Sequence, residues 1–416
     1  MSDAKILDEL FTNFVGNTGI FKNREVLRHD YLPSRLPHRE EQIRMLGEKV
    51  APVLKKERCS NIFVYGKTGT GKTAVTKYVL SRLEVKAKEY DVPVKFCYVN
   101  CRMTGSGYRV FAALCQSIGV SVPFTGLSVG EVFERFRTAL DASGVILIVV
   151  LDEIDALVKV FGDSFLYELT RINETLRQGK LSLIGISNDL RLKEFFDPRV
   201  FSSLSEEEIV FRPYNASELR NILLERAKLA FQENILAESA LNLCAALAAA
   251  EHGDARRALD LLRVSGEVAE RTGAKVVMEE HVREAEKHIE HNRVIEALKG
   301  LTLHSKLVIL SIYHLDRNGV NSTITGEIYD VYGELCGEVG VSPLTQRRLG
   351  TLVNELDAMG LLNAKVVSMG RYGRTKKIRL EVARSLIRDV FGNDIRLGRL
   401  IEYAPKCLSK NARSRS

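Results

Sequence analysis

Short apolar runs alternate with longer helical stretches along residues 61–211 of the chain. The runs have the length and composition of buried strands, and the stretches between them predict helices. Strands that alternate with helices predict a parallel sheet, here of five strands, covered by helices on both faces. The expected strands are residues 61–65, 94–99, 146–151, 181–187 and 208–211, and the expected helices are residues 73–85, 108–118, 129–142 and 165–177.

The pattern changes twice farther along the chain. An Ala-, Leu- and Glu-rich region predicts helices only, and after Gly300 two more helices precede a third helix and a basic hairpin. Residues 1–55 show few strong periodicities and form a lead-in. We therefore expect an α/β domain with its lead-in at residues 1–212, an all-helical domain at 213–299, a C-terminal domain at 300–400 and a basic tail at 401–416.

A glycine-rich segment follows the first expected strand and matches G-x-x-x-x-G-K-[ST], with a helix directly after it. Glycines let backbone N–H groups turn toward phosphate oxygens, and the helix N-terminus adds partial positive charge. Lys72 is expected to reach the β- and γ-phosphates and Thr73 to ligate Mg²⁺. The segment therefore predicts a site for ATP or ADP with Mg²⁺, formed by Gly66, Lys67, Thr68, Gly69, Thr70, Gly71, Lys72 and Thr73.

Polar residues follow the third and fourth expected strands. Asp152 stands where a phosphate-binding domain needs its second metal contact, and Glu153 is suited to orient or deprotonate the attacking water. Asn188 is a candidate to hydrogen-bond the γ-phosphate or that water, although a lone Asn after a strand is usually a turn residue. An acidic cluster at a helix start is the alternative for the two acids. With Lys72, these residues are the predicted catalytic set for ATP hydrolysis.

The C-terminal domain has the pattern of a winged helix. Ser342 as N-cap and Pro343 at the first helical position predict the start of its third helix, and Gly360 predicts the end. Two expected strands follow, and residues 363–380 hold six Lys or Arg and no acid. We expect duplex DNA to be the partner, although a protein-binding winged helix or an edge strand protected by lysines would share the pattern. The candidate DNA contacts are Thr345, Gln346, Arg347, Arg348, Arg371, Tyr372, Arg374 and Lys376.

Charge is distributed unevenly. The net charge is +7, and residues 300–416 hold 18 Lys or Arg against 11 Asp or Glu, whereas residues 1–299 hold 42 of each. The excess favours a polyanionic partner for the C-terminal domain, and a solvated basic tail accounts for only part of it.

The remaining composition argues against membrane and secreted classes. Residues 145–151 form an apolar run far shorter than the roughly 20 residues of a membrane helix, and the N-terminus lacks a secretory pattern. The seven scattered cysteines form no C-x-x-C pair, which favours buried thiols over a metal site. We expect a cytoplasmic, nucleoid-associated protein without a membrane partner.

Taken together, these motifs resemble those of the AAA+ ATPases and, more narrowly, the archaeal origin-recognition and cell-division-control type replication initiators. The resemblance covers residues 17–400, and its further landmarks are residues 36–40, 151–155, 187–188, 197–200, 211–214 and 253–259. It implies an AAA+ P-loop domain, an all-α lid and a DNA-binding winged helix. It also implies ATP-dependent binding of origin duplex DNA, recruitment or loading of the replicative helicase, other initiator copies as partners on DNA, and ATP or ADP as the switch.

The resemblance also implies roles for individual residues. Pro37, His38 and Arg39 would lie near the adenine, Asn188 would be sensor 1, and Arg256 would be sensor 2. Tyr214 and Arg226 would be further nucleotide contacts. For Arg256 the alternative is a solvated helix face, and for Arg226 both interpretations stay open.

One further feature is expected from the resemblance alone, and another departs from the family pattern. Residues 119–130 correspond to an insertion that touches DNA in the family, although they are not basic here. Ser203 stands near the position where AAA+ proteins supply an arginine to a neighbour's nucleotide, and Arg199 lies earlier. We therefore expect slow hydrolysis. The rival functions are a P-loop winged-helix transcription regulator and a DNA-anchored scaffold with vestigial ATPase activity.

Overall fold

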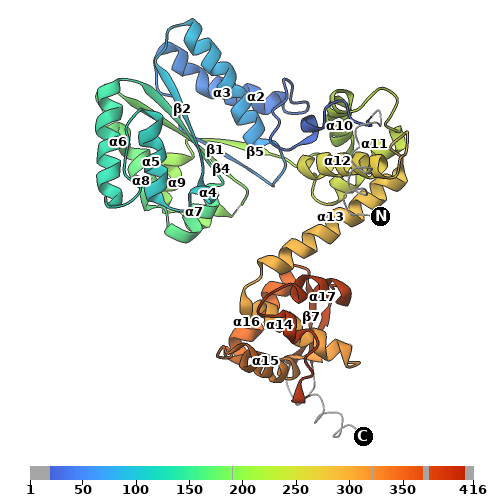
Figure 1. Cartoon of the computed structure of the whole chain (residues 1–416). Helices are drawn as coiled ribbons and strands as arrows, with labels where there is room; N and C mark the ends of the chain where they lie inside the picture. Colours follow the sequence, from blue (N-terminus) through green and yellow to red (C-terminus); the bar gives the residue numbers. More distant parts are fainter. Residues whose placement is uncertain (1–18, 190, 321, 369–373, 408–416) are drawn as a thin grey trace, which may run out of the picture. The chain divides into compact units, whose positions relative to one another are not determined.

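The computed structural model describes residues 19–407, except for residues 190, 321 and 369–373 (Figure 1). The chain divides into two compact units, Met1–Ala285 and Glu286–Ser416.

The first unit contains a five-stranded parallel sheet in the order β2-β3-β4-β1-β5. Register pairs Tyr65 with Ser187 and Asn100 with Asp152, so the carboxyl ends of neighbouring strands lie at one edge. All five predicted strands are present, with boundaries within one residue of expectation. They are β1 (Ile62–Gly66), β2 (Val94–Asn100), β3 (Ile146–Asp152), β4 (Lys180–Ser187) and β5 (Glu207–Phe211).

Both faces of the sheet are covered, as the apolar runs predicted. Leu147, Val149 and Leu151 of β3 belong to one hydrophobic core cluster, whereas Ile148 and Val150 belong to another. Figure 1 shows α2 and α3 on one side of the sheet and α5, α6, α8 and α9 on the other. The α-helices of this region are α2 (Glu40–Val50), α3 (Lys72–Glu89), α4 (Cys101–Thr104), α5 (Gly107–Ser117), α6 (Val129–Ser143), α7 (Ile154–Phe161), α8 (Ser164–Arg171) and α9 (Pro198–Leu204). The 3-10 turns are η1 (Arg24–Leu27), η2 (Ala51–Lys55), η3 (Ile172–Glu174) and η4 (Leu192–Phe195).

The helices differ from expectation in several places. α3 continues four residues past the expected end at residue 85, and α7 and α9 lie where no helix was expected. α8 ends at Arg171, six residues early, because the Asn173 side chain forms two 2.9 Å hydrogen bonds with the backbone of Leu181 and the chain turns toward β4 there. α2 lies within the lead-in, for which no helix was expected. It buries Leu46 and Val50 against the sheet, and its interrupted apolar stripe gave a weak signal.

The lid helices are α10 (Ala216–Ala230), α11 (Glu238–Ala250) and α12 (Ala255–Arg271), followed by α13 (Glu279–Gly300), which spans the division between the units. Asn215 and Glu218 form a capping box at the start of α10, and Asp254 caps α12. These side chains accept hydrogen bonds from backbone amides in the first turn and so fix where each helix begins.

The second unit is a winged helix. Its helices are α14 (Leu303–Arg317), α15 (Thr325–Val339), α16 (Gln346–Ala358) and α17 (Arg384–Gly392), with the turn η6 (Gly398–Leu400). Its antiparallel sheet has the order β6-β8-β7, made of β6 (Thr323–Ile324), β7 (Leu362–Ser368) and β8 (Arg374–Leu380).

The start of α16 corrects one prediction. The N-cap is Thr345, whose Oγ1 accepts a hydrogen bond of 3.4 Å from the amide of Arg348, and not Ser342. The amide of Leu344 donates to the Tyr332 hydroxyl at 3.1 Å, which keeps the chain outside the helix up to that point. Gly360, at φ 73°, ends the helix as predicted.

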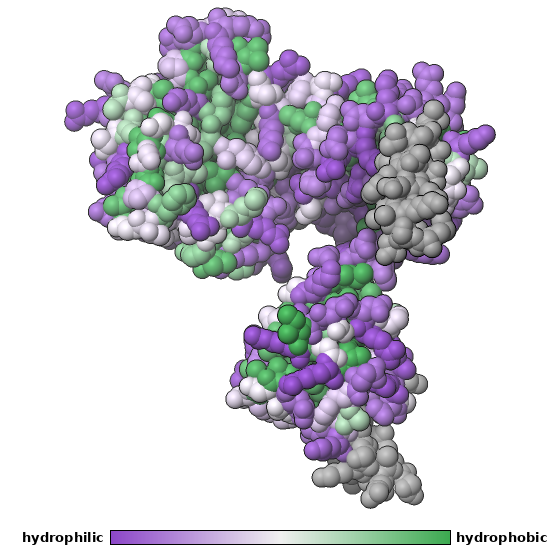
Figure 2. Space-filling model, in the orientation of Figure 1, coloured by the Kyte–Doolittle hydropathy of each residue, from purple (hydrophilic) through white to green (hydrophobic). Residues whose placement is uncertain are grey.

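Six of the seven cysteines are buried, and Cys407 is half-buried. On the face shown in Figure 2, hydrophobic residues are scattered among hydrophilic ones over both units. Among the described helices, none combines the length and apolar character needed to span a bilayer.

Candidate functional site

The glycine-rich segment forms the loop between β1 and α3, at the carboxyl edge of the sheet. α3 starts at Lys72. In its first turn, the amide of Val75 donates a helical hydrogen bond of 2.9 Å to the carbonyl oxygen of Gly71. The amides of the preceding turn therefore have no intrahelical acceptor, which is the arrangement that binds phosphate oxygens.

Lys72 lies inside this loop. Its Nζ donates hydrogen bonds of 2.7 Å to the carbonyl oxygens of Gly66 and Lys67, and the side chain is buried. Burial lowers the pKa of Lys72 to about 8, opposed in part by the negative charge of Asp152. The ammonium is thus held at the loop's centre by weak neutral acceptors, from which a phosphate could displace it.

Asp152 ends β3 beside the start of α3. Its Oδ2 accepts a hydrogen bond of 2.7 Å from the Thr73 hydroxyl and another from the Tyr98 hydroxyl, while Oδ1 accepts one of 2.9 Å from the amide of Glu153. A hydroxyl and a carboxylate side by side form a donor set that Mg²⁺ accepts. The predicted metal ligands Thr73 and Asp152 therefore fit the ion.

Tyr98 was not predicted as part of the site. Burial and the neighbouring Asp152 carboxylate raise the pKa of Tyr98, so its hydroxyl remains a hydrogen-bond donor. Lys77 Nζ lies 4.4 Å from the centre of its ring.

Asn188 follows β4 at the same edge. The Asp155 carboxylate accepts hydrogen bonds from the Ser187 hydroxyl at 3.0 Å and from the amide of Asn188 at 3.2 Å. Asp155, the last residue of the acidic run, thereby fixes the backbone that carries Asn188. The sequence offered no signal for this role.

A cavity of about 240 Å³ lies between these elements and the lid. It brings together most of the predicted site, and among the predicted residues only His38, Arg39, Gly66, Lys67, Thr68 and Thr70 do not line it. The predicted residues that line it are Pro37, Gly69, Gly71, Lys72, Thr73, Asp152, Glu153, Asn188, Tyr214, Arg226 and Arg256.

Arg39 supports the phosphate loop from behind. Its Nε donates to the carbonyl oxygen of Thr70 at 2.9 Å and one guanidinium nitrogen donates to that of Arg212 at 2.7 Å. The guanidinium lies 3.7 Å from the centre of the Tyr214 ring, and burial lowers the pKa of Arg39. The neighbouring His38 contacts Asn221 of the lid at 3.1 Å. Both residues thus tie the loop to the base of the lid.

One wall of the cavity comes from a segment that we call the strap, residues 19–37. The part of the strap from His29 to Pro37 lines the cavity, yet of these residues only Pro37 was predicted. Apart from Leu36, which belongs to the landmark at residues 36–40, no motif marks the others, and the chain before residue 36 gave no signal of a site.

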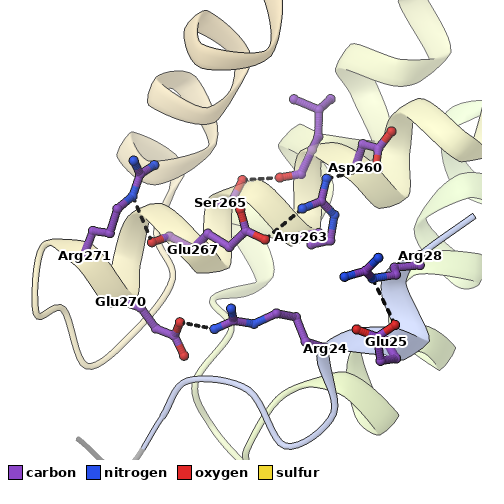
Figure 3. A network of polar contacts seen from close by, with 10 residues as sticks. Arg24, Glu25, Arg28, Asp260, Arg263, Ser265, Glu267, Glu270 and Arg271 are labelled. Carbon is purple, nitrogen blue, oxygen red and sulfur yellow. Dashed lines mark hydrogen bonds and ion pairs between the residues drawn. The ribbon is translucent and has the colours of Figure 1, made fainter. Parts of the chain in front are cut away.

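The strap is fastened to the lid by several contacts. Phe21 stacks on Phe231 with ring centroids 4.9 Å apart, and Arg24 pairs with Glu270 of α12 (Figure 3). Arg226 donates to the carbonyl oxygens of Val26 at 3.0 Å and Tyr31 at 3.2 Å. Arg226 therefore holds the wall of the cavity in place as well as lining it.

The lid meets the phosphate loop directly. The amide of Ala255 donates to the carbonyl oxygen of Gly69 at 3.1 Å, and a Cβ on Gly69 would lie 1.7 Å from Oδ1 of Asp254. Gly69 also has φ +73°, so only glycine satisfies both requirements. The exposed Arg256 follows on α12 and lines the cavity, and its charge contributes to lowering the pKa of Lys72.

The remaining candidates lie elsewhere. Arg199 is in α9 and does not line the cavity. Phe124, in the segment 119–130, is 98% exposed.

In the winged helix, Thr345, Gln346, Arg347 and Arg348 are all exposed at the start of α16. Lys376 of β8 donates to Oδ1 of Asn354 in α16. Arg371 and Tyr372 lie outside the described residues, and so does the side chain of Arg374.

Comparison with known proteins adds three domain matches along the chain. Residues 55–192 match an AAA domain, residues 220–287 match the Cdc6 AAA+ ATPase-type lid domain, and residues 296–390 match the CDC6 C-terminal winged helix domain. These matches agree in order with the sheet, the lid and the winged helix, which confirms the predicted fold class.

Similar proteins match over nearly the whole chain. An ORC1-type DNA replication protein of Thermococcus onnurineus is 51% identical over 95% of this chain and 96% of its own length. One from Archaeoglobus fulgidus is 48% identical over 95% and 96%. A solved structure of the Aeropyrum pernix ORC1 protein in complex with DNA has a TM-score of 0.85 and 49% identity, covering 92% of this chain and 100% of that one. The chain described here belongs to the family of ORC1-type DNA replication proteins.

Proposed function

We propose that this chain is an ATP-dependent replication initiator that binds origin duplex DNA through its winged helix and helps to recruit or load the replicative helicase. One observation carries the proposal. A cavity lined by Lys72, Asp152 and Arg256 lies at the junction of sheet and lid, in a chain whose C-terminal unit is a winged helix with exposed arginines.

The cavity would hold the nucleotide. Lys72 would leave its carbonyl acceptors for the phosphates, and Thr73 and Asp152 would hold Mg²⁺. The ion, when bound, neutralises charge on the β- and γ-phosphates. Glu153 would orient the attacking water, with Asn188 beside it at the cavity wall. Hydrolysis would be slow because Ser203 stands near the position where AAA+ proteins supply an arginine to a neighbour's nucleotide.

ATP and ADP would act as a switch through the lid. The contact between Ala255 and Gly69 places Arg256 next to the phosphate loop. An arginine on the lid senses the γ-phosphate because the lid angle then depends on that charge.

The DNA contact would be made by the start of α16 and by the hairpin between β7 and β8. Thr345, Gln346, Arg347 and Arg348 are free to enter a major groove, and Lys376 lies on the adjoining strand. The solved Aeropyrum pernix relative, at 49% identity, is in complex with DNA. Other copies of the initiator would bind neighbouring sites on the same DNA.

A footprint on candidate origins tests this function. Wild type with ATP and with ADP should protect discrete origin sites, and the double variant Arg347→Ala/Arg348→Ala should weaken the protection. Arg263→Ala/Arg271→Ala, on lid arginines that contact Glu267, is the matched control and should footprint as wild type does. Protection confined to promoters would support a transcription regulator instead, and protection without sequence preference would contradict origin recognition.

A further inference from the structure

The Asp152 carboxylate is restrained by three hydrogen bonds. Its Oδ1 accepts from the backbone amide of Glu153, and its Oδ2 accepts from both Thr73 and Tyr98. Thr73 is itself a metal ligand in the proposed site, so its hydroxyl serves two partners. Among the residues that the structure describes, Tyr98 is the one side chain outside the phosphate loop that donates to this carboxylate.

The strand register brings Tyr98 to this position. Tyr98 of β2 pairs with Val150 of β3, and Asp152 lies two residues farther along β3 on the same face. The phenol therefore extends along the sheet toward its carboxyl edge, where the carboxylate lies.

The Tyr98 ring also contacts a lysine of α3. Lys77, one helical turn after Thr73 on α3, places its ammonium 4.4 Å from the ring centre and also lines the cavity. Asp152, Tyr98 and Lys77 thus form a continuous contact series from the metal ligands to the cavity wall.

We propose that Tyr98 is a positioning residue of the Mg²⁺ site, whose hydroxyl fixes the Asp152 carboxylate in the orientation that faces Thr73. The inference rests on the proposed Mg²⁺–nucleotide site. Partners that orient a metal ligand are worth about 10-fold to 100-fold in metal affinity. The hydroxyl of Tyr98 acts on the ion only through Asp152, and it makes no contact with the reacting atoms.

A second tyrosine supplies the comparison. Tyr65 of β1 also donates its hydroxyl to a carboxylate, Glu208 of β5, at 2.9 Å. Neither tyrosine lines the cavity, but Asp152 does and Glu208 does not. A tyrosine that merely satisfies a neighbouring acid at the sheet would behave like Tyr65. A positioning residue would differ from it in one respect, the dependence of nucleotide binding on Mg²⁺.

The experiment measures the affinity of the full chain for a fluorescent ADP with Mg²⁺ and with EDTA, for wild type, Tyr98→Phe and Tyr65→Phe. Phenylalanine keeps the ring against Lys77 and removes only the hydroxyl. We expect Tyr98→Phe to lose about 10-fold of the affinity gained from Mg²⁺, with unchanged affinity in EDTA. Tyr65→Phe should match wild type in both conditions. Titration of each ADP complex with Mn²⁺, followed by electron paramagnetic resonance, should show the same loss for Tyr98→Phe.

Three outcomes would overturn the inference. If Tyr98→Phe kept the full increase in ADP affinity that Mg²⁺ gives, the tyrosine hydroxyl would have no role in positioning the metal ligand. Equal losses with Mg²⁺ and with EDTA would make it a residue that shapes the cavity. Absence of any Mg²⁺ gain in wild type would remove the proposed nucleotide function as well, which distinguishes that failure from the first two.

Discussion

Folding and nucleotide binding make opposite demands on Lys72. The side chain is buried and its Nζ donates to the carbonyl oxygens of Gly66 and Lys67, and this burial lowers its pKa to about 8 from an ordinary value of 10.5. Burying an ammonium costs free energy, and this cost disappears when the amine is neutral. Phosphate binding, in contrast, needs the charged form.

The pH dependence of stability and that of affinity should therefore have opposite signs. Above pH 8 the folded protein releases the Lys72 proton before the unfolded chain does, so the free energy of unfolding without nucleotide should rise between pH 8 and 10.5. Affinity for ADP should fall over the same range, by up to about tenfold for each pH unit. Fluorescent ADP titrations from pH 7 to pH 9 measure the second effect. Lys72→Arg, whose side chain stays charged, should show no such fall; a flat profile in wild type would contradict the argument.

At the level of single residues, the sequence predicted those parts of the site that a contiguous motif specifies. The phosphate loop and Asp152 are of this kind. Tyr98 could not be predicted, because its partner lies 54 residues away and the contact depends on the register of two strands. Arg39 was expected near the adenine, and its contacts with the carbonyl oxygens of Thr70 and Arg212 depend on the packing of three separate segments.

Among the elements, α16 shows how a capping signal can be misread. Ser342 and Pro343 have the composition of a helix start, but Tyr332 holds the amide of Leu344 and delays the helix until after Thr345. The apolar runs, by comparison, placed every strand of the parallel sheet to within one residue, because each strand contains such a run, and β3 at the centre of the first core is buried throughout. Local caps compete with tertiary contacts, whereas long apolar runs do not.

The two possible caps of α16 can be separated by a matched pair of variants. Thr345→Ala should destabilise the start of α16 by about 1 kcal/mol, which would speed hydrogen exchange in its first turn by about fivefold. Ser342→Ala should leave exchange there unchanged, since Ser342 is exposed and three residues before the cap. Exchange followed by mass spectrometry on the full chain measures both, and equal effects would contradict Thr345 as the cap.

On the scale of the molecule, the two units have separate cores and different charge. One hydrophobic cluster lies entirely within residues 298–401, and the clusters on the two faces of the parallel sheet lie entirely within residues 46–211. The positive excess belongs to residues 300–416. A polyanion should therefore be bound by the second unit, with little electrostatic help from the first.

This division predicts how DNA binding responds to salt. The affinity for DNA falls as salt rises, and each phosphate contact removed should reduce the magnitude of the slope of log affinity against log salt by about 1. Arg347→Ala/Arg348→Ala should therefore reduce it by about 2. The lid variant Arg263→Ala/Arg271→Ala removes the same charge from the first unit and should keep the wild-type slope. Fluorescence anisotropy with duplex DNA at several salt concentrations measures the slopes, and equal reductions in both variants would show that the charge acts through the whole chain.

The strap has a consequence for the order in which the protein folds during synthesis on the ribosome. Arg24 is synthesised 246 residues before its partner Glu270, and Tyr31 is synthesised 195 residues before Arg226. At about 5 to 20 residues per second, the strap waits roughly 10 to 50 s for the lid that will hold it. During that time Val26 and Leu27, which end fully packed, have no partners to cover them. The strap, although synthesised early, thus reaches its final place only after the lid has emerged, and until then the cavity lacks the walls that the strap and the lid form.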